Sequence, residues 1–154
     1  MTFYELITIT HIIGTVLGVG AATFAEIHYL RFKSDDIVTD DEKNTLTTFY
    51  TVMRVGLFLL VISGFAYLLY FRLAENVGIL TSPIFWAKMS IIAVLVGNAL
   101  LLQIKWIPFI AGAAISFTSW YAALVIGVIG RASATYFEVM AYYVAAILIV
   151  GVIL

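Results

Sequence analysis

The sequence predicts an all-α integral membrane protein, built as an antiparallel bundle of five transmembrane helices. Of its 154 residues 64% are hydrophobic and only 11% are charged, and the mean hydropathy is +1.10. A water-facing surface needs far more charge than this. Apolar runs of about 20 residues, enough to span a ~30 Å hydrocarbon core, recur along the chain. The alternation typical of transmembrane strands is absent, so the spans are expected to be helices.

Each predicted helix is an apolar stretch between polar or turn-forming segments. The hydrophilic connector 33–45 (KSDDIVTDDEKNT) separates the first two helices and contains a helix-start signal near Thr39. Pro83 suits the first turn of the third helix, and Trp106 and Pro108 form the turn before the fourth. Short loops favour an up-down bundle forming a single domain, 1–154. The helices are expected at about 3–32, 46–71, 83–104, 108–130 and 135–154.

Basic residues in the loops predict the orientation, because they are enriched on the cytoplasmic side. The first and third loops carry four of them and the second and fourth carry two; they are Arg31, Lys33, Lys43 and Lys105 against Arg72 and Arg131. We therefore expect a multi-pass protein of the cell (inner or plasma) membrane with its N-terminus outside and its C-terminus in the cytoplasm. No basic patch indicates a nucleic-acid partner.

One face of the first helix is lined by small residues. At 100° per residue, His11, Gly14, Gly18, Ala22 and Ala25 fall within one narrow strip. Two objects can fill such a strip: a neighbouring helix packed through a small-xxx-small seam, or the plane of a macrocycle whose metal His11 ligates. From this helix alone, helix packing is favoured, because such seams are common in membranes.

Polar residues inside the predicted helices fall into two layers. Glu26 and Arg54 both lie about 10–12 Å from the cytoplasmic ends of sequential helices, which predicts a structural ion pair between them. His11, Lys88 and Gly64 lie about 8–12 Å from the outer ends. Lys88 either extends to the headgroups or stays neutral and donates its lone pair to a metal. The chain has no cysteine, so thiolate metal sites are excluded.

Several short motifs resemble those of small bacterial membrane families. They are the H-x6-G-x-G pattern from His11, Met53-Arg54-x-Gly56, Ser63-Gly64 and Phe85-Trp86-Ala87-Lys88. Over residues 3 to 105 the chain is similar to the copper-resistance D family and to the membrane-bound protoporphyrinogen oxidase. The resemblance to the oxidase implies a b-type haem ligated by His11 and Lys88, the two residues that the depth argument places in one layer.

Three functions agree with these observations. The first is a haem b-binding membrane redox protein, with His11 and Lys88 as metal ligands and Gly14, Gly18 and Gly64 making room; it would act on a porphyrinogen or exchange electrons with a quinone. The second is a small dimeric ion or solute transporter or channel, with Glu26 and Arg54 lining a path together with His11 and the glycine seam forming the homo-oligomer contact. The third is a non-catalytic accessory membrane subunit. The sequence leaves open whether the protein is an enzyme.

Overall fold

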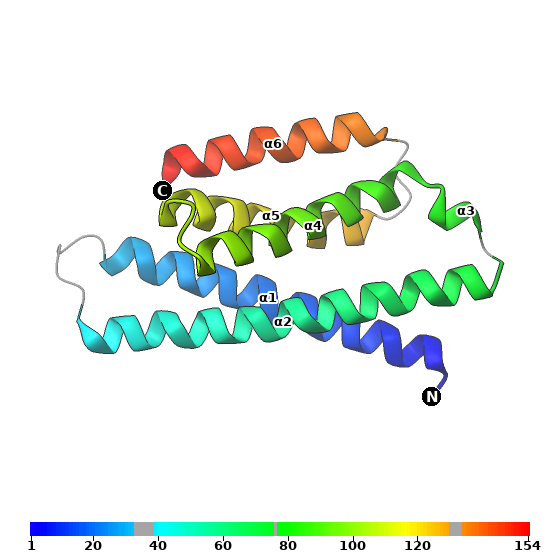
Figure 1. Cartoon of the computed structure of the whole chain (residues 1–154), viewed down its shortest axis with the longest axis horizontal. Helices are drawn as coiled ribbons and strands as arrows, with labels where there is room; N and C mark the ends of the chain where they lie inside the picture. Colours follow the sequence, from blue (N-terminus) through cyan, green and yellow to red (C-terminus); the bar gives the residue numbers. More distant parts are fainter. Residues whose placement is uncertain (33–38, 76, 130–133) are drawn as a thin grey trace.

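The computed structural model describes the chain except for residues 33–38, 76 and 130–133. The described residues contain no strands, and five of their helices are long and apolar enough to cross a membrane, which confirms the predicted all-α class. The helices are α1 (Phe3–Phe32), α2 (Asp40–Leu73), α3 (Val77–Leu80), α4 (Pro83–Gln103), α5 (Phe109–Ile129) and α6 (Tyr136–Ile153). The five long helices run roughly along the longest axis of the molecule (Figure 1).

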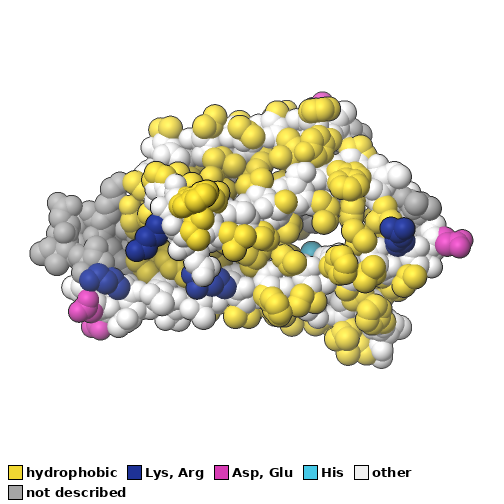
Figure 2. All heavy atoms as spheres, in the orientation of Figure 1, with side chains coloured by type: hydrophobic (Ala, Val, Ile, Leu, Met, Phe, Trp, Pro, Cys, Tyr) yellow, Lys and Arg dark blue, Asp and Glu magenta, His cyan; other side chains and the backbone are white. Residues whose placement is uncertain are grey.

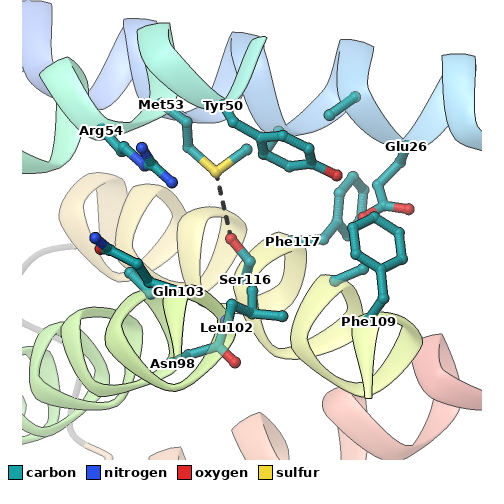
Figure 3. Close-up of a pocket in the computed structure, with 14 residues that line it drawn as sticks. Glu26, Tyr50, Met53, Arg54, Asn98, Leu102, Gln103, Phe109, Ser116 and Phe117 are labelled. Carbon is teal, nitrogen blue, oxygen red and sulfur yellow. Dashed lines mark hydrogen bonds between the residues drawn. The ribbon is translucent and has the colours of Figure 1, made fainter. Parts of the chain in front are cut away.

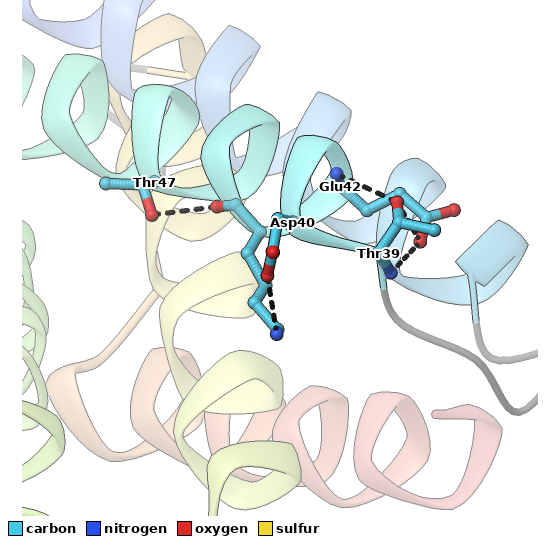
Figure 4. Close-up of polar contacts among 5 residues, drawn as sticks. Thr39, Asp40, Glu42 and Thr47 are labelled. Atoms are coloured by element: carbon cyan, nitrogen blue, oxygen red, sulfur yellow. Dashed lines mark hydrogen bonds and ion pairs between the residues drawn. The ribbon is translucent and has the colours of Figure 1, made fainter.

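Helix α2 begins six residues before the predicted helix because a capping box starts it. The Thr39 side chain accepts a hydrogen bond from the Glu42 N–H at 3.3 Å, and the Thr39 N–H donates to Glu42 Oε2 at 2.7 Å (Figure 4). Such reciprocal bonds satisfy two free donors at a helix start. With 34 residues, α2 is about 51 Å long, so its polar first turns extend beyond the hydrocarbon core.

The other helix ends agree with the predicted segments, with one addition. The four-residue helix α3 lies in the segment that was predicted as the loop 72–82, and Pro83 occupies the first turn of α4. A second capping box, between Thr135 and Glu138, begins α6. Glu138 is exposed and bonded at this helix start, so it does not belong to the His11 layer.

Glycines set the close crossing of α1 and α2. A Cβ built on Gly14 would lie 2.9 Å from the Gly56 carbonyl oxygen, and one built on Gly56 would lie 2.8 Å from the Gly14 carbonyl oxygen. A side chain at either position would therefore overlap the facing backbone. Trp120 of α5 is fully buried and its ring covers Gly18, which joins α5 to this pair of helices. The core forms around Ala22, Leu60, Leu95 and Trp120.

The helices form two groups that α5 connects. Helices α1 and α2 pack along their lengths, α5 packs against α1, α4 and α6, and within the described residues α2 and α4 do not pack closely (Figure 1). Figure 2 shows an apolar face with most charged groups toward the two ends of the long axis, and a histidine side chain at the floor of a hollow. Charges at the ends and apolar groups between them are the distribution that a membrane-spanning bundle requires.

Candidate functional site

His11 is held by a hydrogen bond to the neighbouring helix. Its Nδ1 lies 2.9 Å from the hydroxyl oxygen of the buried Ser63 on α2. The Ser63 hydroxyl donates its single proton to a backbone carbonyl of its own helix, that of Leu59 at 2.6 Å. With the serine proton on that carbonyl, Ser63 Oγ can only accept, which requires a proton on His11 Nδ1 and leaves the lone pair of a neutral imidazole on Nε2.

Aromatic and hydroxyl groups surround the His11 ring on the side toward the N-terminus of α1. The edge of the Tyr67 ring contacts it, with ring centres 5.5 Å apart and planes at 75°. The Tyr67 hydroxyl donates to Thr8 Oγ1 at 2.7 Å, and Thr8 in turn donates to the Tyr4 carbonyl at 2.8 Å. These bonds link α1 to α2 on the N-terminal side of His11, so the imidazole has little freedom to turn.

Lys88 of α4 is the lysine that the depth argument placed in the His11 layer. Its side chain is half-buried, and among the described residues no acidic group forms an ion pair with it. Within the described residues, the helices α1 and α4 that carry His11 and Lys88 do not pack closely against each other. The predicted layer thus contains one anchored imidazole and one lysine without an acidic partner.

The glycines predicted to make room for a macrocycle differ in their surroundings. The α2 backbone occupies the space beside Gly14, and a Cβ on Gly18 would overlap the Trp120 ring, 2.1 Å away. These two glycines serve helix packing and leave no room for a flat cofactor. In contrast, a Cβ on Gly64 would meet nothing within 4 Å. Of the predicted cofactor-binding set, His11 is held by Ser63, Lys88 is half-buried and Gly64 has open space beside it, so these three positions remain the candidates for holding a haem.

A separate pocket of about 230 Å³ lies between α1, α2, α4 and α5, and neither His11 nor Lys88 lines it (Figure 3). Glu26 and Arg54 do line it, together with Tyr50, Asn98 and Gln103 among the polar residues. Of the three residues of the predicted transport path, Glu26 and Arg54 line this pocket and His11 does not. The remaining lining residues are Ala22, Ala25, Met53, Ala99, Leu102, Phe109, Ala113, Ser116 and Phe117.

The predicted ion pair between Glu26 and Arg54 is absent. Oε2 of Glu26 is buried and has no hydrogen-bond partner, whereas the Arg54 side chain is exposed. Figure 3 shows them at opposite sides of the pocket, with Tyr50 and Met53 between them. The depth argument placed both residues in one layer but could not give the rotation of each helix about its axis, and that rotation keeps the charges apart.

Asn98 is a buried polar residue of this pocket that the sequence analysis did not predict as part of a site. It is 4% exposed, and its Nδ2 donates to the Gly112 carbonyl of α5 at 2.9 Å, but its Oδ1 has no partner. Ser116 of α5 donates to Met53 Sδ at 3.4 Å across the pocket. In the sequence, Asn98 is an amide side chain within an apolar helix. That pattern alone does not tell whether the amide bonds to a neighbouring helix or binds a ligand.

His28 lies apart from both sites. Its Nδ1 is 2.8 Å from the Phe24 carbonyl one turn earlier, and its ring packs at 5.0 Å from that of Phe49. It is seventeen residues from His11 on the same helix, about 25 Å along the axis, so the two histidines cannot share a metal within one chain. No three His, Asp or Glu side chains gather as metal ligands in the part of the chain that the structure describes.

Comparisons with protein-family models, with curated proteins and with solved structures give no match. The fold and the two sites nevertheless define a class of protein. It is a helical membrane bundle with an anchored histidine near one end and, near the other, a pocket whose lining includes Glu26 and Arg54.

Proposed function

We propose that the chain is a b-type haem-binding redox protein of the cell membrane and that His11 Nε2 is an axial ligand. The hydrogen bond from His11 Nδ1 to Ser63 is the observation that carries this proposal. Histidines that ligate metals almost always donate their other ring N–H to an oxygen, which fixes the tautomer and the ring orientation.

Lys88 is the second ligand in this proposal. A half-buried lysine without an acidic partner is costly when charged at membrane depth, so a role as a neutral donor accounts for it. The open space beside Gly64 supports a bulky group near the two side chains. When bound, haem supplies one-electron transfer, while the protein sets its ligands and keeps the surroundings dry. The electron partner belongs to the quinone or porphyrinogen class.

Spectroscopy of the detergent-purified protein tests the proposal. After expression with haem supplied, oxidised and dithionite-reduced spectra and a pyridine haemochrome assay should give about one haem per chain. His11→Ala should lose the haem while the protein keeps its helical circular dichroism. His28→Ala is the matched control, because it removes the other histidine of the same helix and should leave haem content unchanged.

Two results would contradict the proposal. A colourless wild-type protein would exclude haem binding. A His11→Ala variant with normal haem content and an unchanged spectrum would exclude His11 as the ligand. For the second ligand, Lys88→Met should shift the spectrum and Lys105→Met, at the exposed turn between α4 and α5, should not.

A further inference from the structure

The pocket between α1, α2, α4 and α5 contains two buried acceptors without donors. Glu26 Oε2 and Asn98 Oδ1 are shielded from solvent and have no hydrogen-bond partner. Buried polar groups in folded proteins almost always have one. Both residues line the pocket, where a ligand that draws either side chain inward can supply the missing donor.

The charges around the pocket favour a neutral ligand. Glu26 and Arg54 both line it, so its formal charges cancel when both are ionised. A cation would meet Arg54 and an anion would meet Glu26. A ligand must donate a hydrogen bond to satisfy Glu26 Oε2 or Asn98 Oδ1, and it must accept one from Arg54. A hydroxyl group does both, which makes a hydroxylated ring suitable at either side.

The apolar walls of the pocket suit a flat ring. Phe109 and Phe117 lie beside Glu26, and Tyr50 and Met53 lie between that side and Arg54 (Figure 3). Aromatic side chains stack on flat rings, and a methionine side chain adapts to irregular shapes. Met53 packs against the core cluster, and its sulfur accepts a long hydrogen bond of 3.4 Å from Ser116 across the pocket.

We infer that the pocket opens between α2 and α4. Helices α2 and α4 do not pack closely, and each contributes an exposed polar side chain to the lining, Arg54 and Gln103 respectively. Arg54 lies about 20 Å along α2 from Asp40, well inside a helix long enough to cross the membrane. A ligand can therefore enter sideways from the lipid.

We propose that this pocket binds the head group of a lipid-soluble quinol. One hydroxyl donates to the Glu26 carboxylate or to Asn98 Oδ1, and the oxygen of the opposite hydroxyl accepts from the Arg54 guanidinium. The ring lies between Met53 and Phe117. Because His11 and Lys88 do not line this pocket, the inference goes beyond the haem proposal, and its test does not require haem.

The test is equilibrium binding to the full chain in detergent under anaerobic conditions. Trimethylhydroquinone is the probe, and its dimethyl ether, which has the same ring but no donor, is the matched control ligand. The quinol should bind at least about tenfold more tightly than the ether, because only the quinol satisfies the buried acceptors. Isothermal titration calorimetry measures both.

Protein variants place the binding in the pocket. Glu26→Leu should weaken quinol binding at least about tenfold, since it removes the strongest acceptor. Glu75→Leu, at the exposed turn after α2, is the control and should change nothing. Ala99→Phe fills the pocket without removing a polar group and should abolish binding. If Glu26→Leu does not fold, the Ala99→Phe variant and the ether comparison decide the question.

Three outcomes would overturn the proposal. Equal affinity for quinol and ether would show that the acceptors are not used. No quinol binding by the folded wild-type chain would show that the pocket is not a quinol site. Tighter binding of benzylamine than of the quinol, lost in Glu26→Leu, would make this a cation site.

Discussion

At the scale of single residues, the most informative contact is between His11 and Ser63. When Ser63 donates its proton to the helix backbone, it acts toward the imidazole only as an acceptor, and His11 Nε2 is then the free nitrogen. The depth argument placed Gly64 in the histidine layer, but a sequence gives neither this contact of the neighbouring Ser63 nor its direction.

Replacing Ser63 by alanine tests this positioning role. Ser63→Ala should weaken haem retention by about 10–100-fold and shift the midpoint potential, since outer-shell partners set ligand orientation and basicity. Haem titration and potentiometry measure the two effects. Ser90→Ala is the control, because Ser90 also bonds an aromatic side chain, Tyr136, at 3.1 Å, but lies outside the site. An unchanged potential in Ser63→Ala would show that the bond only joins helices.

The absence of an ion pair between Glu26 and Arg54 leads to a second prediction. In a double-mutant cycle, the free-energy changes of Glu26→Gln and Arg54→Gln should add to within about 0.5 kcal/mol, as expected for groups that do not touch. Glu26→Gln alone should be neutral or stabilising, because it removes a buried carboxylate without a partner. Thermal unfolding in detergent provides the data. A coupling energy above about 1 kcal/mol would mean that the two charges pair in the membrane.

At the scale of helices, glycines on α2 have opposite surroundings. Gly56 faces the α1 backbone, whereas a Cβ on Gly64 meets open space. Gly56→Ala should therefore lower the stability by about 1–3 kcal/mol, since the two backbones must separate. Gly64→Ala, the matched control on the same helix, should be neutral or stabilise by up to about 1 kcal/mol through helix propensity. Equal effects in thermal unfolding would show that α1 and α2 do not cross at Gly56.

Helix positions were predictable from the sequence, but helix rotations were not. Length and hydropathy locate all five spans because lipid requires continuous apolar helices. The first turns of α2 fell outside those spans because they are polar, and α3 did so because it has only four residues. Depth along an axis grouped His11 with Lys88. Rotation about the axis decides that Glu26 is covered while Arg54 is exposed, and it depends on side-chain packing that no single helix encodes.

At the scale of the whole molecule, the two sites lie toward opposite ends of the bundle. His11 is nine residues into α1 and Glu26 is six residues from its end, so about 22 Å of helix separates them. If the N-terminus is outside, as the loop charges predict, the histidine site lies toward the outer surface and the pocket toward the cytoplasm. The orientation therefore determines which compartment each site can exchange protons with.

Cysteine labelling tests this orientation directly, because the chain contains no cysteine of its own. Single substitutions at neutral, exposed positions leave the loop charges intact: Ala74→Cys after α2, Asn44→Cys at the start of α2 and Trp106→Cys between α4 and α5. A membrane-impermeant maleimide applied to intact spheroplasts should label Ala74→Cys at once and the other two only after lysis. The reverse pattern would invert the topology and place the pocket at the outer surface. The inferred route for a lipid-soluble ligand, between α2 and α4, would be the same in either orientation.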